Sequence, residues 1–104
     1  MVDLDLVEGF DWDTGNARKS EQKHGIAQAE SEQIFFNVPL IVADDISHSG
    51  SEARFNALGK TDAGRLLHVT FTLRENGRLI RVISVRDMNR KEKLRYDEDA
   101  QENS

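Results

Sequence analysis

The feature that most constrains the fold is an Asn76-Gly77 pair between two runs rich in apolar and β-branched residues. Asn-Gly favours the tight turn of a β-hairpin, because both residues tolerate the positive φ angles that such a turn needs. The runs on either side, Arg65 to Arg74 and Leu79 to Arg86, are therefore expected to be paired antiparallel strands. Both faces of the second run are partly apolar, which is typical of a central strand.

Two earlier segments are expected to extend this hairpin into a sheet. Leu40-Ile41-Val42-Ala43 is a short apolar run directly after Pro39, a residue that cannot continue a helix. Glu52 to Leu58 is the next run, bounded by turn sequences at residues 48–51 and 61–64. The sequence thus predicts a four-stranded antiparallel sheet between residues 40 and 86.

Helical spacing is found on both sides of the strand region. Asp13 or Thr14 can cap a first helix over about 14–24, and Gly25 suits the left-handed residue after its end. A second helix is expected over about 27–37, where apolar residues recur at helical spacing. Asn89 and Glu92 have the spacing of a capping box, which predicts a last helix to about Asp99.

Two N-terminal helices, an antiparallel sheet and a C-terminal helix make an α+β fold, and we expect the helices on one face of the sheet. The length of 104 residues suits a single domain over 1–104, with a core over about 9–97 and a frayed acidic tail over 98–104. Apolar residues make up 38% and charged residues 32% of the chain, a globular balance.

Several classes of protein are excluded or disfavoured by composition. The chain has no cysteine, so disulfides, thiolate catalysis and cysteine-ligated zinc are excluded. No apolar run approaches the roughly 20 residues that span a bilayer, and the acidic start does not resemble a signal peptide. We therefore expect a cytoplasmic protein without a membrane association. No His and carboxylate spacing indicates a metal site, and no Gly-rich loop indicates a nucleotide cofactor.

The net charge of −5 hides an uneven distribution. The segment 74–95 contains eight Lys or Arg and three Asp or Glu, a balance of +5. Such a basic stripe is typical of a surface that contacts phosphates. It is equally consistent with a solvated helix face or with a docking site for an acidic partner.

A set of short sequence blocks, in their order and spacing, resembles the BrnT family over residues 9–97. The resemblance implies a RelE-like fold and a metal-independent endoribonuclease toxin that cleaves RNA and thereby inhibits translation. It also implies neutralisation by a BrnA-like ribbon-helix-helix antitoxin, in a complex with two copies of each chain, and binding to operator DNA only through that antitoxin. The blocks are Phe10-Asp11-Trp12-Asp13, Lys23-His24-Gly25, His48-Ser49, Glu52-Ala53-Arg54-Phe55, Gly59, Gly64-Arg65-Leu66-Leu67, Arg81-Val82-Ile83-Ser84-Val85-Arg86, and Glu92 with Tyr96.

Metal-free RNA cleavage needs a base for the 2′-OH, an acid for the departing 5′-oxygen and cations at the phosphate. His24 is the first candidate for proton transfer, and Lys23 beside it for phosphate contact, although both residue types also stabilise helix C-termini. His48 and Glu52 form a second candidate pair for catalysis, with Arg54 as a phosphate contact. The alternative for Glu52 and Arg54 is an exposed ion pair.

The predicted fourth strand adds two arginines. Arg86 at its end is the first candidate for transition-state stabilisation, because a guanidinium binds two phosphate oxygens and stays charged. Arg81, among apolar neighbours, is either a phosphate contact or half of a structural ion pair. On regular alternation, Ser84 and Arg86 share a face with Ile80 and Val82.

The sequence hypothesis is therefore an endoribonuclease with His24, His48, Glu52 and Arg86 as catalytic residues and Lys23, Arg54 and Arg81 at the phosphate. His68 is expected to be a hydrogen-bonded structural residue. The alternative hypothesis is a binding module that pairs with an antitoxin but no longer cleaves RNA. It is motivated by Val85, where the family has a small residue, and by Asp87, which could pair with Arg86.

Overall fold

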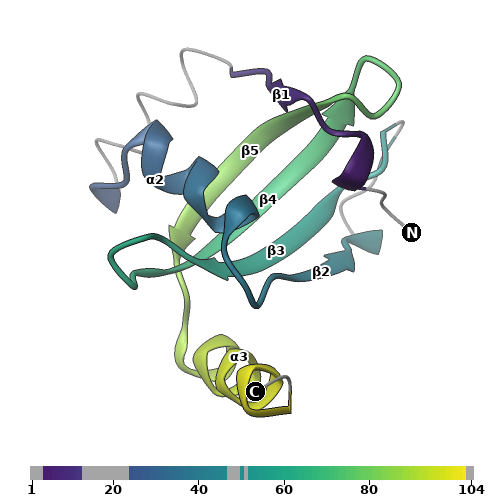
Figure 1. The fold of residues 1–104 in the computed structure, drawn as a ribbon. Coiled ribbons are helices and arrows are strands. Elements are labelled where there is room, and N and C mark those ends of the chain that lie inside the picture. The colour runs from purple at the N-terminus through teal and green to yellow at the C-terminus, as the bar shows by residue number, and fades with distance from the viewer. Residues whose placement is uncertain (1–3, 13–23, 47–49, 51, 103–104) are drawn as a thin grey trace.

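The computed structural model describes residues 4–12, 24–46, 50 and 52–102, and its centre is a five-stranded sheet in the order β1-β5-β4-β3-β2 (Figure 1). The α+β class is as predicted. The elements are η1 (Leu4–Leu6), β1 (Gly9–Phe10), α2 (Gln28–Gln33), η2 (Ile34–Phe36), β2 (Ile41–Asp44), β3 (Phe55–Lys60), β4 (Leu66–Arg74), β5 (Leu79–Asp87) and α3 (Arg90–Glu102).

The sheet follows the predicted meander from β2 to β5, and each of these strands is antiparallel to the next. The hairpin between β4 and β5 is confirmed, with positive φ at Glu75, Asn76 and Gly77. The prediction of a purely antiparallel four-stranded sheet was wrong, because β1 adds a fifth strand parallel to β5. Two residues, Gly9 and Phe10, are too few to show a strand period in a sequence.

A β-bulge in β5 changes which residues share a face. Thr70 pairs with Ser84 but the next residue, Phe71, pairs with Val82, so Ile83 is the extra residue. The predicted faces of the fourth strand were therefore wrong beyond Val82. Val85 is buried in the core with Ile80 and Val82, while Arg86 lies on the opposite face.

The main core lies between one face of the sheet and the segment from Ile26 through α2 and η2. Ile34 reaches β3 at Gly59, where an added Cβ would lie 2.7 Å from the Cβ of Ile34. Only a residue without a side chain allows this close approach. The buried members of this core are Ile26, Ile34, Ala57, Leu67, Val69, Phe71, Ile80, Val82 and Val85.

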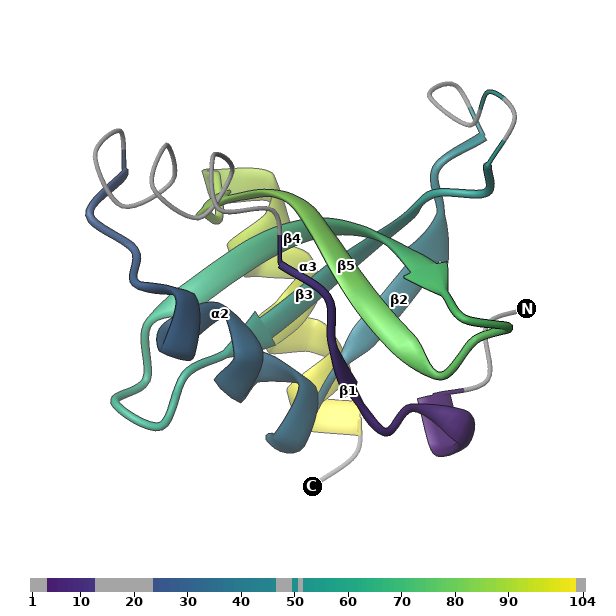
Figure 2. The same ribbon diagram turned by 90° about the horizontal axis from the view of Figure 1, so that it is seen from above.

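The helix α3 packs against the other face of the sheet (Figure 2). Tyr96 is buried with Leu58 and Met88, and its hydroxyl donates to the carbonyl of Pro39 at 2.6 Å. The prediction that the helices gather on one face was therefore wrong. Because Leu58 and Gly59 are neighbours in a strand, they lie toward opposite faces, so β3 packs against η2 at Gly59 and against α3 at Leu58.

Some of the predicted helix ends agree with the structure and others differ from it. The capping box of α3 is confirmed, since Asn89 and Glu92 exchange two hydrogen bonds of 2.9 Å. The helix α3 continues to Glu102, past the expected end near Asp99. The second predicted helix corresponds to α2 and η2, which together cover residues 28–36, and α2 begins at Gln28 after an alanine that offers no capping side chain. The first predicted helix lies outside the described residues except for its last residue.

The left-handed conformation expected of Gly25 is confirmed by its φ of 63°. No helix among the described residues is long and apolar enough to cross a membrane.

Candidate active site

The face of the sheet opposite α2 carries an open polar hollow of about 470 Å³, a size typical of ligand sites. We call it the Arg86 hollow. Its floor is formed by β3, β4 and β5, and it is also lined by Asp45 and Arg54, which share a backbone hydrogen bond of 2.9 Å. Its lining consists of Asp45, Arg54, Asn56, His68, Thr70, Ile83, Ser84 and Arg86. A second hollow shares Asn56 and His68 with it and extends to Lys91, Glu92 and Arg95 on α3.

The bulge at Ile83 is what places Ser84 and Arg86 in this hollow rather than in the core. Across the β4–β5 pair, Thr70 then lies opposite Ser84 and His68 lies opposite Arg86. Directly opposed residues on one sheet face have neighbouring side chains. The floor of the hollow is therefore a polar patch on a sheet whose other face is apolar.

Arg86 forms a two-bonded ion pair with Glu92 from the first turn of α3. Its two terminal nitrogens donate to the two carboxylate oxygens at 2.8 and 3.0 Å, and Nη1 also donates to the carbonyl of Asp87 at 3.1 Å. This pairing raises the pKa of Arg86 above its ordinary value. Within the described residues, these bonds involve three of the five N–H groups of a guanidinium, and the side chain is 40% exposed.

Glu92 is held as a carboxylate by its neighbours. Burial pushes its pKa upward most strongly, but hydrogen bonds from Arg86 and from the backbone of Asn89, with the charges of His68 and Arg86, lower the pKa below its ordinary value. Its Oε1 accepts both from Arg86 and from the N–H of Asn89. The start of α3 thus fixes the carboxylate that orients Arg86.

His68 lies between these groups. Its Nε2 is 3.8 Å from Oε2 of Glu92, and its side chain is 14% exposed. Burial and, next, the charge of Arg86 lower the pKa of His68 below its ordinary value, although Glu92, a hydrogen bond of the imidazole with its own backbone, and Asp45 oppose this. His68 is therefore a neutral imidazole at neutral pH, as a general base must be.

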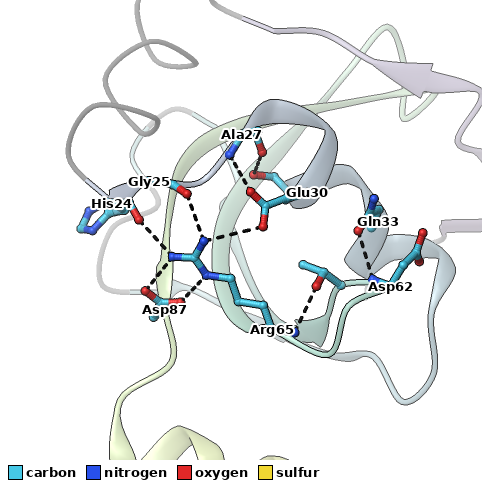
Figure 3. A network of polar contacts seen from close by, with 10 residues as sticks. His24, Gly25, Ala27, Glu30, Gln33, Asp62, Arg65 and Asp87 are labelled. Atoms are coloured by element: carbon cyan, nitrogen blue, oxygen red, sulfur yellow. Dashed lines mark hydrogen bonds and ion pairs between the residues drawn. The ribbon is translucent and has the colours of Figure 1, made fainter.

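A second arginine cluster lies on the α2 face, and we call it the Arg65 cluster (Figure 3). Arg65 donates to both carboxylate oxygens of Asp87 at 2.8 and 3.0 Å, and to the carbonyls of His24 and Gly25 at 3.0 Å each. Oε2 of Glu30 is 3.6 Å from Nη1 of Arg65. The Arg65 cluster joins the end of β5 to the segment that leads into α2.

The sequence suggested that Asp87 could pair with Arg86. In the structure the side chain of Asp87 does not pair with Arg86. Neighbouring strand residues point to opposite faces, so Asp87 meets Arg65 while Arg86 meets Glu92. The hydrogen bond from Arg65 is the main reason that the pKa of Asp87 lies below its ordinary value.

Two of the predicted site residues, Arg54 and Arg86, line the same hollow. The others that the structure describes lie elsewhere. His24 lies at the Arg65 cluster, where its charge helps to lower the pKa of Asp87, and Figure 3 shows its imidazole pointing away from Arg65. Glu52 pairs with Arg74 at 3.0 Å, and Arg81 lies 3.9 Å from Asp11. Lys23 and His48 lie outside the described residues.

The basic stripe of the sequence is not one continuous cationic surface. Arg74 and Arg81 each approach a carboxylate, and Arg86 binds Glu92. Several basic residues do lie near one another at the two hollows, together with acidic residues. The bases that line the hollows are Arg54, Arg86, Lys91 and Arg95, and the acids are Asp44, Asp45 and Glu92. The site is thus polar and mixed in charge, with a slight cationic excess.

Sequence reasoning missed two groups of the Arg86 hollow. Glu92 was recognised as a helix cap, but nothing in its spacing showed that it also binds Arg86. His68 was assigned a structural role, because alternation alone places it beside Leu66 and Thr70 without showing what it faces. The available signal was the Asn76-Gly77 hairpin, which fixes the β4–β5 register and so sets His68 opposite Arg86 once the bulge is counted.

The Arg86 hollow combines two guanidinium groups, a neutral imidazole and hydroxyl and amide groups from Ser84, Thr70 and Asn56. Thr70 donates its hydroxyl to Oδ1 of Asn56 at 2.8 Å, which orients that amide. Guanidinium groups suit phosphate oxygens, and an imidazole suits proton transfer near neutral pH. Among the described residues, no three His, Asp or Glu are grouped as metal ligands.

Comparison with known proteins agrees with this architecture. The crystal structure of the Brucella abortus ribonuclease toxin BrnT matches with a TM-score of 0.60 and 20% identity, over 81% of this chain and all of that one. No curated protein sequence matches the chain. Residues 12–92 match the sequence profile of a family described as "Ribonuclease toxin, BrnT, of type II toxin-antitoxin system". The chain therefore belongs to the BrnT family of ribonuclease toxins of type II toxin–antitoxin systems.

Proposed function

We propose that this chain is an endoribonuclease toxin that cleaves RNA in the Arg86 hollow without a metal ion, and that the cleavage inhibits translation. The observation that carries the proposal is the convergence of Arg86, Arg54 and His68 on one open, polar sheet face in a chain of this family. The three side chains come from separate segments of the chain, so the hollow exists only in the folded protein.

The chemistry that suits this site uses the 2′-OH of the substrate as nucleophile. Arg86 and Arg54 hold the oxygens of the scissile phosphate and stabilise the charge that grows on them in the transition state. The 2′-oxygen attacks phosphorus, the bond to the 5′-oxygen breaks, and the products carry a cyclic phosphate and a 5′-OH. Glu92 does not touch the substrate in this scheme, but keeps the guanidinium of Arg86 in place.

The alternative, a binding module that does not cleave RNA, was based on Val85 and Asp87, and the positions of these two residues do not support it. Val85 is buried in the core, away from the Arg86 hollow, and the carboxylate of Asp87 binds Arg65. Neither residue weakens Arg86 directly. We therefore prefer the nuclease.

The partner that we propose is a BrnA-like ribbon-helix-helix antitoxin, through which alone the complex reaches operator DNA. The cytoplasm, where RNA and ribosomes are found, is the proposed location. Family membership supports these assignments, since a type II toxin acts beside a protein antitoxin.

A cleavage assay with purified chain tests the nuclease directly. RNA is incubated with the chain in excess EDTA, beside a strand of the same sequence with 2′-deoxy sugars. We expect cleavage of the RNA with cyclic-phosphate ends, and no cleavage of the deoxy strand. Intact RNA at all chain concentrations would overturn the proposal, and cleavage of both strands would overturn the role of the 2′-OH.

The antitoxin proposal needs its own experiment. Induction of the chain alone in bacteria should arrest growth, and co-expression of a BrnA-like protein should restore it and co-purify with the chain. Growth arrest that such a protein neither relieves nor binds would contradict this partner.

A further inference from the structure

His68 is the side chain that joins the two hollows of the α3 face. It lines the Arg86 hollow and the adjoining one, and lies directly opposite Arg86 in the β4–β5 pair. Its Nε2 faces the carboxylate of Glu92 at 3.8 Å. With 14% of its side chain exposed, His68 is largely buried yet still borders the open space.

We propose that His68 is the proton-transfer residue of the cleavage reaction and that Glu92 positions it beside Arg86. This inference rests on the proposed nuclease function and names the group that performs its acid–base step. Of the three histidines in the sequence, His24 lies at the Arg65 cluster and His48 lies outside the described residues.

The reaction balances with His68 as the base. The neutral imidazole takes the proton of the 2′-OH while the 2′-oxygen forms its bond to phosphorus. The bond from phosphorus to the 5′-oxygen breaks, and that oxygen takes a proton from water or from the newly formed imidazolium. No electrons are exchanged with a cofactor, and the net result is one cyclic phosphate and one 5′-OH.

The surroundings of His68 suit this role better than a purely structural one. The imidazole of His68 has a hydrogen bond with its own backbone, while the Glu92 carboxylate lies beyond hydrogen-bond distance of Nε2 and is already bonded to Arg86, so Glu92 does not occupy Nε2. The charged groups that face His68 are Arg86 from β5, Glu92 from α3 and Asp45 after β2. Four further charged residues line the two hollows that His68 borders: Arg54, Asp44, Lys91 and Arg95.

Glu92 acts through its neighbours and not on the substrate. Its Oε2 accepts from Arg86 at 3.0 Å and faces Nε2 of His68, so one carboxylate sets the separation of the cation and the base. The backbone of Asn89 holds the other oxygen at 2.9 Å. Movement of the first turn of α3 would therefore disturb both functional side chains together.

The test is the pH profile of cleavage by the full chain and by His68→Gln, which keeps a polar side chain of similar length but cannot titrate. The substrate is a short RNA of fixed sequence, followed from about pH 5 to about pH 9, around the pKa of an ordinary imidazole. We expect kcat to fall by about 10²–10⁴-fold with little change in KM, and the acid limb of the profile to vanish. Lys60→Gln, a matched change at an exposed position of β3, should leave rate and profile unchanged.

A second variant keeps the inference testable if His68→Gln folds poorly. Glu92→Gln removes the negative charge that raises the pKa of His68, so the acid limb should move to lower pH as kcat falls. An acid limb that stays in place in Glu92→Gln, or a His68→Gln chain with the rate and profile of the parent, would overturn the inference. A parent chain that cleaves no RNA would instead overturn the proposed function itself.

Discussion

The two arginine clusters of this protein have similar ion pairs but different surroundings. Arg65 binds the carboxylate of Asp87 through two nitrogens, and Arg86 binds that of Glu92 in the same way. One member of each pair lies at the end of β5, where Arg86 and Asp87 are adjacent in sequence. Arg65 also donates to two backbone carbonyls and approaches Glu30, so protein groups occupy its guanidinium although 32% of the side chain is exposed. Arg86 instead borders an open hollow with His68 and Arg54.

This difference shows how one strand end can serve both structure and chemistry. An arginine whose donors all meet protein groups contributes to stability, because removing it leaves acceptors without partners. An arginine with N–H groups directed at an open polar hollow can bind a phosphate. The alternation of β5 separates the two roles by a single residue.

Of the two arginines, Arg86 should have the larger effect when it is replaced, and that effect is on catalysis. Arg86→Ala should reduce RNA cleavage by roughly 100-fold to 1,000-fold, the effect of removing a group that stabilises transition-state charge. Arg86→Lys should recover only part of the rate, because an ammonium lacks the planar fork. The measurement is kcat/KM on the same RNA, with urea unfolding to confirm that both variants fold. Cleavage by Arg86→Ala at the parental rate would contradict the comparison.

The close approach of η2 to β3 should contribute to stability. Gly59→Ala places a methyl group 2.7 Å from Cβ of Ile34, so the segment over the sheet must shift. We expect a loss of about 1–3 kcal/mol in the free energy of unfolding, typical of overpacking. Lys60→Ala, next to it but exposed, should change stability by less than about 0.5 kcal/mol. Equal stabilities in urea titrations would show that this approach is not tight.

Arg65→Ala should also act on stability. Its loss leaves the carbonyls of His24 and Gly25 and the carboxylate of Asp87 without this donor, which we expect to cost about 1–2 kcal/mol at so exposed a site. Cleavage by the folded fraction should fall by much less than in Arg86→Ala. If Arg65→Ala lost as much kcat/KM as Arg86→Ala while remaining folded, the two clusters would not differ as described.

The smallest expected effect is a loss of stability in acid. The pKa values of Asp87 and Glu92 lie below their ordinary 3.8 and 4.5, so the unfolded chain takes up protons first as the pH falls. The stabilisation is complete above about pH 5 and is lost as the pH drops through the folded-state pKa values. His68, whose pKa lies below 6.5, adds a loss in the same direction that begins near pH 6.5.

Urea unfolding midpoints measured at a series of pH values check this direction. Asp87→Asn and Glu92→Gln should each flatten the acid side of the curve, Asp87→Asn without moving the pH profile of cleavage. A parent chain whose stability rises below pH 5 would contradict the sign of these shifts.

Much of the sheet could be predicted from the sequence, since Asn76-Gly77 fixes a hairpin and short apolar runs mark the strands before it. The bulge at Ile83 could not be predicted, because nothing in Ile-Ser-Val distinguishes a bulged strand from a regular one. That single residue decides that Arg86 and Val85 exchange faces. The parallel pairing of Gly9 and Phe10 was equally hidden, because two residues show no period.

Only part of the candidate site could be predicted, because its residues are brought together by pairing between distant segments. Arg54 and Arg86 were recognised by type and position, and they do line one hollow. His68 could be assigned only after the register and the side of α3 were known, since its neighbours in space come from β5 and α3. Local sequence shows which residues can perform chemistry, while long-range pairing decides which of them meet.

RNA is expected to bind on the α3 face, at the Arg86 hollow. An NMR titration of the chain with a short 2′-deoxy strand, which cannot be cleaved, tests it directly. We expect backbone amide shifts to change at Asn56, His68, Thr70 and Ser84 and to stay constant at Gly25, Glu30 and Arg65. Changes centred on the latter three residues, with none around the hollow, would show that RNA does not bind at the Arg86 hollow.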